Sequence, residues 1–226
     1  MVGCTKPPGN ASGDGLGRFC KAHLEHYRRH GDPLKGSYKA AQLAPHRKAA
    51  AAWIKENRTD PFAVAALGAV ESLMLSAGKV IEPQNLRGVP TKDRARSIWA
   101  RIRDRGRKPE EALAAILSVA ICYAADYQRA KPEHRTVQIA KVLNRLGGGR
   151  VKRWPVHDPS APNRTITLRW FPASEGLVLR EIGEQAERAA EFLIHDRMEQ
   201  LIEYSAQYRQ RLALTALPFT EQSSKV

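Results

Sequence analysis

The part of the chain richest in potential metal ligands is GRFCKAHLEHYRRHGDP, residues 17–33, with one cysteine, three histidines and two adjacent arginines. Cys20 and His23 are three residues apart, so a helix would place them one turn apart on nearly the same face. Thiolate and imidazole are the ligands of tetrahedral zinc sites, and a C-x2-H pair at a helix start is a common half-site. A segment this short has almost no core of its own, so a bound metal would account for its order.

Two further residues could complete such a site. Cys4 lies in the preceding glycine-rich segment, where a flexible chain can wrap back toward the helix. His26 is three residues beyond His23, whereas His30 is seven residues beyond it and too far along a helix to share the ion easily. The sequence therefore predicts a structural zinc site formed by Cys4, Cys20, His23 and His26. The alternative is a polar helix face that carries incidental Cys and His residues.

The same stretch is also basic. Lys21, Arg28 and Arg29 would lie on the predicted helix, and Arg18 stands just before it. Lysine and arginine are the side chains that most often contact nucleic-acid phosphates. We predict that these four residues contact a nucleic-acid backbone.

The run of Cys4, Cys20 and His23, followed by Arg-Arg-His-Gly-Asp-Pro at 28–33, resembles a small zinc-binding motif of bacteriophage and prophage proteins. That motif is often found with HNH endonucleases, and the resemblance covers roughly the first 35 residues. The motif's first cysteine would fall before Met1, so either the natural start lies further upstream or this ligand is lost, and the loop between Cys4 and Cys20 is longer than in the motif. The resemblance implies a zinc-stabilised module in a phage-type protein. It favours DNA over RNA, because the motif is often found with HNH endonucleases.

The rest of the chain does not match an HNH nuclease, which needs a histidine base and further ligands around one divalent ion. His46, His134 and His157 are isolated in the sequence, and we expect each to be a surface histidine. No glycine-rich phosphate loop, Ser-His-Asp order or carboxylate cluster stands out. The sequence therefore favours a non-catalytic protein, with an unrecognised nuclease as a remaining alternative.

Composition narrows the class of partner. The 226 residues are 42% hydrophobic, and 37 Lys and Arg against 23 Asp and Glu give a net charge of +14. Basic chains of this size usually bind a polyanion. Three scattered cysteines are too few for a disulfide scaffold. Since no long apolar run or signal-peptide pattern is present, we expect a protein of the bacterial host cytoplasm with no membrane partner.

Hydrophobic periodicity predicts a mainly α-helical fold with one β-hairpin. The strongly apolar segment at 108–128 predicts a central core helix, alternation at about 150–171 predicts the hairpin, and 177–212 predicts a single long helix of about thirty residues. We divide the chain into a zinc-knuckle-like module at 1–36, a helical domain at 37–218 and a disordered tail at 219–226. The predicted core includes Leu113, Ile116, Leu117, Ile121, Val142, Leu143, Leu193 and Ile194.

Two segments of the helical domain concentrate its positive charge. Residues 79–109 hold ten Lys and Arg against three acids, and residues 129–155 hold eight against one. In the first, arginines flank an apolar helical stripe, so either their stems cover the core edge or the helix contacts phosphate. In the second, a basic hairpin after a short helix is similar to the wing of a winged helix-turn-helix domain. The predicted contacts to phosphates or bases are Arg101, Arg105, Arg150, Lys152, Arg153 and Trp154.

These observations favour a phage-type DNA-binding protein with a structural zinc site. The alternative is a phage or prophage regulator or inhibitor that binds a host protein, with its charge complementary to an acidic partner. Salt separates the two, because binding to phosphates weakens steeply with ionic strength, whereas an apolar protein interface does not.

Overall fold

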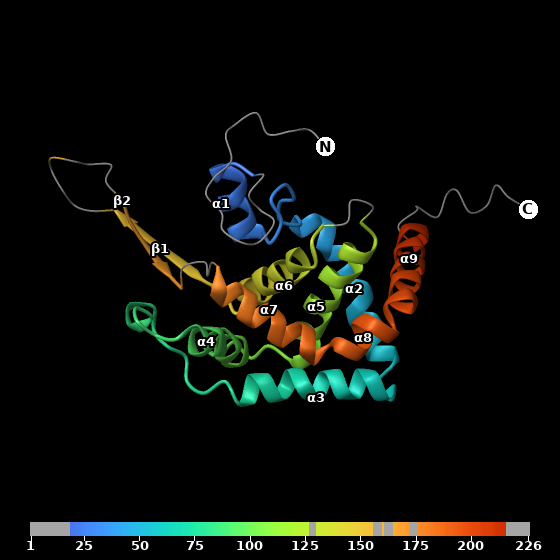
Figure 1. The fold of residues 1–226 in the computed structure, drawn as a ribbon. Helices are drawn as coiled ribbons and strands as arrows, with labels where there is room; N and C mark the ends of the chain where they lie inside the picture. The colour runs from blue at the N-terminus through green and yellow to red at the C-terminus, as the bar shows by residue number, and fades with distance from the viewer. Residues whose placement is uncertain (1–18, 127–129, 156–159, 161–164, 172–175, 216–226) are drawn as a thin grey trace, which may run out of the picture.

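A computed structural model describes residues 19–126, 130–155, 160, 165–171 and 176–215. In these ranges the chain forms nine α-helices, one 3-10 turn and a two-stranded hairpin, which confirms the predicted mainly α-helical fold (Figure 1). No helix in the same ranges is both long and apolar enough to span a lipid bilayer. The elements are α1 (Lys21–His30), α2 (Ala40–Glu56), α3 (Pro61–Leu75), η1 (Pro83–Asn85), α4 (Thr91–Asp104), α5 (Pro109–Ala124), α6 (Pro132–Leu146), β1 (Arg150–Pro155), β2 (Thr165–Trp170), α7 (Leu177–Ala189), α8 (Glu191–Asp196) and α9 (Met198–Thr215).

Helix α5 is the centre of the helical body. Every residue from Ala112 to Ile121 is buried, as expected for a helix that is apolar on all faces. Helices α2, α3, α6 and α9 pack against it. The structure thus confirms the central core helix that the sequence predicts.

Proline marks the start of three helices of the body. Pro61, Pro109 and Pro132 each occupy the first turn of their helix, where the missing N–H costs no hydrogen bond. The side chain of Asp60 caps α3 by accepting hydrogen bonds from the next two free backbone N–H groups, at 2.9 and 3.0 Å. The start of α6 at Pro132 matters most here, because the N-terminal module packs against that end of the helix.

Seven of the eight predicted core residues are buried, and Val142 is the exception. Helix α6 turns Thr136, Ala140 and Leu143 toward the body. At 100° per residue, Val142 lies toward the solvent-facing side of the C-terminal half of the helix. It is therefore only partly buried, packed against the edge of the core.

The single long helix predicted at 177–212 is wrong. The chain forms three helices there, with breaks at Ala190 and Arg197, whose φ angles are −110° and −118°. The breaks let the helices wrap around the body, so Ala190 and Leu193 are both buried. The side chain of Arg197 lies over the ring of Phe62 on α3, 4.8 Å from its centroid. Tertiary packing therefore sets the breaks, since neither glycine nor proline stands at them.

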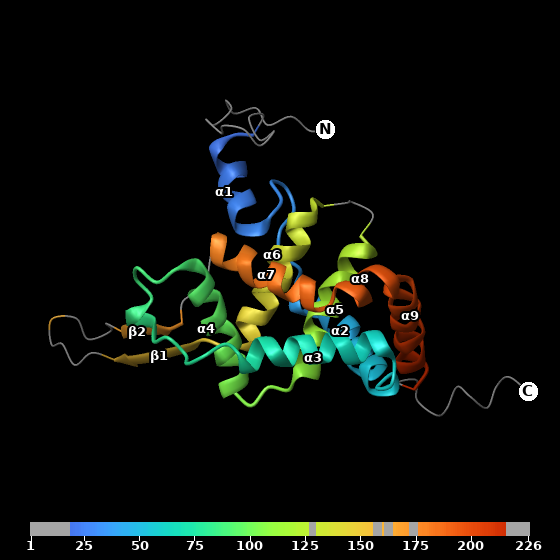
Figure 2. The ribbon, with the colours of Figure 1, turned by 60° about the horizontal axis from the view of Figure 1, so that its bottom comes forward.

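The predicted hairpin is confirmed. Strands β1 and β2 pair antiparallel, with Arg150 opposite Trp170 and Pro155 opposite Thr165. The two views show the hairpin projecting from the helical body on the side where α4 lies (Figures 1 and 2). It follows α6 after three glycines, so the geometry of that junction decides where the basic strand β1 points.

Candidate nucleic-acid interface

Cys20 and His23 come together as their spacing predicts. Cys20 is the N-terminal capping residue of α1, and its Sγ lies 3.5 Å from Nδ1 of His23. A tetrahedral zinc ion with Zn–S of about 2.3 Å and Zn–N of about 2.0–2.1 Å separates its sulfur and nitrogen ligands by about 3.5 Å. The pair therefore fits two corners of one zinc site, while Cys4 lies outside the described residues.

His26 does not join this pair. Its Nδ1 donates a hydrogen bond to the backbone carbonyl of Asp32 at 2.9 Å, and its ring stacks on that of His30 with centroids 4.3 Å apart. In the described part of the chain, no group of three or more His, Cys, Asp or Glu side chains is placed to hold a metal ion. A zinc ion held by Cys20 and His23 would need at least two further donors, of which the predicted Cys4 lies outside the described residues.

The Gly-Asp-Pro turn after α1 fastens the module to the start of α6. Gly31 has a φ of +74°, and a Cβ there would lie 2.5 Å from the carbonyl oxygen of Glu133. The carboxylate of Asp32 accepts hydrogen bonds from the N–H groups of Leu34 and Lys35, each at 2.8 Å, and of Lys131 at 3.2 Å. Burial opposes the ionisation of Asp32, yet these backbone donors hold its pKa below the ordinary value.

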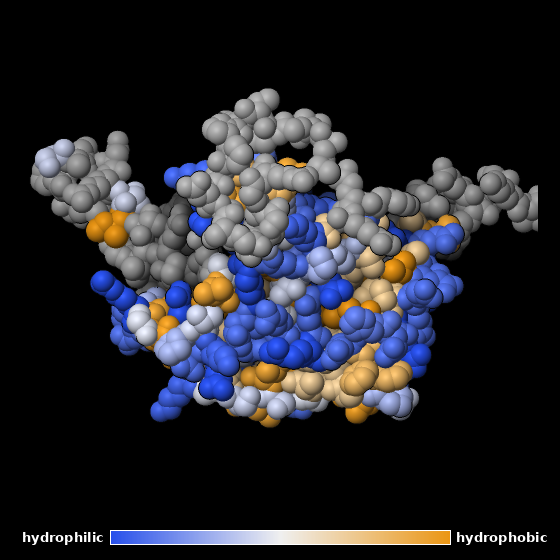
Figure 3. Space-filling view, viewed as in Figure 1, coloured by the Kyte–Doolittle hydropathy of each residue, from blue (hydrophilic) through white to orange (hydrophobic). Residues whose placement is uncertain are grey.

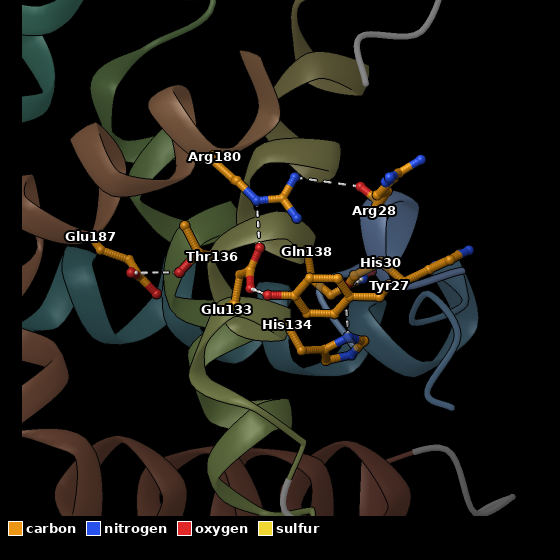
Figure 4. A network of polar contacts seen from close by, with 9 residues as sticks. All are labelled: Tyr27, Arg28, His30, Glu133, His134, Thr136, Gln138, Arg180 and Glu187. Carbon is orange, nitrogen blue, oxygen red and sulfur yellow. Dashed lines mark hydrogen bonds and ion pairs between the residues drawn. The ribbon is translucent and has the colours of Figure 1, made fainter. Parts of the chain in front are cut away.

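A polar network joins α1 to α6 and α7 (Figure 4). The hydroxyl of Tyr27 donates to one carboxylate oxygen of Glu133, and Arg180 donates to the other. Arg180 also donates to the backbone carbonyl of Arg28 at 3.4 Å. Two helices of the body therefore hold the last turn of α1 from one side.

Histidine side chains fill the rest of this seam. His134 donates through Nδ1 to the carbonyl oxygen of His30 at 2.8 Å, and Gln138 donates to the same oxygen at 3.4 Å. Nδ1 of His30 accepts a hydrogen bond from the ammonium group of Lys141 at 3.1 Å. Burial, and then the charge of Lys141, lower the pKa of His30 to about 4, so its ring is neutral at pH 7.

Two of the three isolated histidines are now placed. His134 is fully buried in the seam, so its prediction as a surface residue is wrong. Helix α6 carries the ring beneath the backbone of the N-terminal module. His46 is partly buried and its Nδ1 lies 2.8 Å from the hydroxyl of Ser205, which is itself buried and cannot meet a substrate. His157 lies outside the described residues.

The predicted phosphate contacts on α1 remain on the surface. Lys21, Arg28 and Arg29 are exposed, and within the described residues none of them forms an ion pair. Figure 4 shows the side chain of Arg28 directed away from the network that holds its backbone. Arg18 lies outside the described residues. One side of the helix is therefore anchored to the body, and the cations stay available to an external anion.

Arg101 is not on the surface, and we remove it from the predicted contacts. Only 6% of its surface is exposed. Its guanidinium donates to the carbonyl of Gly148 at 2.9 Å and to Oδ1 of Asn144 at 2.6 Å. Burial, and then the nearby charge of Arg105, lower its pKa to about 10. The apolar stripe of α4 carries Arg101 into the body, where its charge is satisfied internally.

Arg105, the residue that directly follows α4, is exposed and lies over the backbone of Gly148. This contact brings together the two basic segments that are far apart in the sequence, because Gly148 lies two residues before β1. The backbone of β1 carries Arg150, Lys152, Arg153 and Trp154, whose side chains lie outside the described part of the structure. The end of α4 and the base of the hairpin are thus one continuous surface region.

Helix α6 does not present an open face for groove reading. In helix-turn-helix proteins the recognition helix must enter the major groove. Here α6 lies between α1, α5 and α7, with eight of its residues buried. The similarity to a winged domain therefore ends at the hairpin.

Comparison of the chain with protein-family models, with curated proteins and with solved structures finds no match.

Proposed function

We propose that the protein is a non-catalytic nucleic-acid-binding protein of the phage type that binds duplex DNA in the cytoplasm of a bacterial host. The observation that carries this proposal is that α1 has one face bound to the helical body and one face of exposed cations. Its backbone and its Tyr27 and His30 side chains bind the body, while Lys21, Arg28 and Arg29 stay exposed without an ion pair in the described residues. A polyanion is the partner that such a surface on a chain of net charge +14 favours.

A structural zinc ion would complete this arrangement. The seam with α6 holds the C-terminal end of α1, whereas the N-terminal end carries Cys20 and His23 side by side. A zinc ion bound by these two residues and Cys4 would fix the preceding segment on the same helix, because folding of small metal modules is coupled to metal binding. The role of the ion would be to hold the exposed cations in place and not to take part in a reaction.

Salt dependence tests the DNA-binding proposal. Each phosphate neutralised on B-DNA contributes about 0.9 to the slope of log affinity against log salt. Removing Arg28 and Arg29 together should therefore lower the slope by roughly one to two units and weaken all sequences alike. The measurement is fluorescence anisotropy of a labelled random duplex, titrated at several salt concentrations.

A matched control distinguishes these contacts from a general loss of charge. Lys55 and Arg58, at the far end of α2, are exposed and their removal changes the net charge by the same amount. The control variant should keep the wild-type slope. Equal effects in both variants would contradict the proposal, as would wild-type binding that persists at about 0.5 M salt or is absent at low salt.

A second candidate, binding to a host protein, is favoured by one apolar surface. Val64 and Leu75 on α3 and Phe192 on α8 are each more than half exposed. The rings of Phe62 and Phe192 stack with centroids 5.9 Å apart. Figure 3 shows apolar residues gathered along the edge of the molecule that α3 occupies in Figure 1. A partner on this surface would bind with little salt dependence, and Val64→Asp would weaken it without changing the affinity for DNA.

A further inference from the structure

The base of the hairpin is built around a buried charge. Arg101 reaches from α4 to Asn144 on α6 and to the carbonyl of Gly148, and its guanidinium lies 4.5 Å from the centroid of the Phe171 ring. Phe171 directly follows β2 and has a φ of +59°, a conformation that bulky residues rarely adopt. One side chain therefore contacts the glycine junction that leads into β1 and the residue that follows β2.

The glycines before β1 let α4 approach this junction closely. A Cβ at Gly147 would lie 3.3 Å from the carbonyl oxygen of Ile98, and a Cβ at Gly148 would overlap the guanidinium of Arg105. Gly148 also has a φ of +69°, which favours glycine. The junction is thus a packed joint and not a loose linker between α6 and the hairpin.

The projecting hairpin needs such a joint. A two-stranded ribbon is marginally stable in water by itself, and here no third strand pairs with it in the described residues. Hydrogen bonds from a buried guanidinium are stronger than those between neutral groups. These charge-assisted hydrogen bonds thus lie at the point where they can fix the direction of the hairpin.

The sequence around this joint is strongly basic. No acidic residue occurs between Glu133 and Asp158, a stretch that includes all of β1. Arg105, directly after α4, and Arg145, on α6, are both exposed. A phosphate backbone is the ligand that a cluster of cationic residues favours.

We infer that the C-terminal turn of α4 and the hairpin form one rigid contact unit for a nucleic-acid backbone, in which Arg101 is the positioning residue and Arg105 contacts phosphate. This inference rests on the proposed DNA binding for its ligand. The positioning role itself is a property of the chain and can be tested without DNA. Two measurements therefore separate the parts of the inference.

The first measurement is hydrogen exchange of the full chain without DNA. Arg101→Met removes both hydrogen bonds and the ring contact. Arg105→Met is the same change four residues later, at the exposed position that directly follows α4. We expect amides of the hairpin to exchange about tenfold faster or more in R101M, since hydrogen bonds to a charged group are lost. The hairpin in R105M and the core helix α5 in both variants should exchange as in the wild type.

The second measurement is the salt slope of duplex binding. R105M should lower the slope by about 0.9, the contribution of one phosphate. R101M should lower the salt slope by more than R105M does, because the cations of a misdirected hairpin lose their phosphate contacts together. In a background that already carries Arg150→Ala, Lys152→Ala and Arg153→Ala, R101M should change the slope no further, as expected for residues that act as one unit.

Several results would overturn the inference. An R101M slope equal to that of R105M, or an effect that adds in full to the triple variant, would show that Arg101 acts by itself. Unchanged hairpin exchange in R101M with normal DNA binding by the wild type would remove the positioning role alone. Faster exchange with no DNA binding by the wild type would instead remove the contact role and the proposed function together.

A milder variant tests the positioning role in case R101M destabilises the whole fold. If α5 exchanges faster in R101M, Asn144→Ala removes one of the two hydrogen bonds at a half-buried site. It should accelerate hairpin exchange by a smaller factor and leave α5 protected. Full hairpin protection in this variant, too, would contradict the positioning role.

Discussion

Replacing Gly31 by alanine should detach the N-terminal module from the body. The glycine adopts a left-handed conformation, and its Cα faces the backbone of α6, where a Cβ would lie 2.5 Å from the Glu133 carbonyl oxygen and 2.8 Å from the His134 nitrogen. Both contacts are with backbone atoms of a helix start, so a small side-chain rotation cannot relieve them. The substitution therefore requires the turn after α1 to move away from α6.

The size of the effect follows from two costs. A left-handed conformation costs a residue with a Cβ about 1–2 kcal/mol, and forcing an extra carbon into a packed contact costs about 1–3 kcal/mol. The sum, about 2–5 kcal/mol, is a large part of the stability of a typical domain. Because the seam can open locally, the loss should be limited to the docking free energy and appear mainly as opening of the module.

Hydrogen exchange of individual amides is the assay. In Gly31→Ala we expect faster exchange at Leu34, Lys35 and Lys131, whose N–H groups bind Asp32 in the wild type. Core amides of α5 should change much less.

Gly36 is the matched control. It is exposed, with no atom within 4 Å of an added Cβ, and its φ lies outside the left-handed region. Gly36→Ala should be neutral or stabilise by up to about 1 kcal/mol through the unfolded state. Equal exchange in the two variants would refute the view that the Gly-Asp-Pro turn is a docking element.

Two further outcomes concern metal and pH. If zinc is present, purified protein should contain about one ion per chain. Cys20→Ser should then remove the ion and make the amides of α1 exchange faster. Wild-type protein that contains no metal but has a protected α1 would contradict the site. Burial lowers the pKa of His30, to about 4, and of His134. Both rings are therefore neutral in the folded state, and their contribution to stability is present above the unfolded pKa of about 6.5 and is lost as pH falls toward 4. Urea midpoints at pH 7 and 5 check this, and His30→Gln should reduce the difference; an unchanged difference would exclude the seam as its source.

The elements that the sequence predicts well are those whose pattern is local. The ten consecutive buried residues of α5 are almost all apolar, and proline and a capping aspartate mark the helix starts. The hairpin follows from alternation and a turn-rich loop. In each case the neighbours in the sequence carry the signal that the fold uses.

The features that sequence patterns miss depend on distant contacts. No glycine or proline stands at the breaks at Ala190 and Arg197. Arg197 instead contacts two residues at the start of α3, donating a hydrogen bond to Asp60 and lying over the ring of Phe62. Arg101 looks like a flanking cation because its position on the helix wheel does not reveal Asn144 more than forty residues away. Burial of His134 depends on the module that covers it, which the sequence of α6 cannot show.

The run Arg-Arg-His-Gly-Asp-Pro divides into two functions once it is folded. The exposed cations come first, and the residues from His30 to Asp32 then bind the start of α6. Helix α6 leads from this seam to the glycine junction of the hairpin, and its fifteen residues correspond to about 22 Å. This is shorter than one turn of B-DNA, about 34 Å. A single duplex could therefore meet α1 and the hairpin at once, with the Gly31 turn fixing one contact and Arg101 fixing the other. On this argument, Gly31→Ala and Arg101→Met should each remove one of two separate sets of phosphate contacts, and their effects on the salt slope should add.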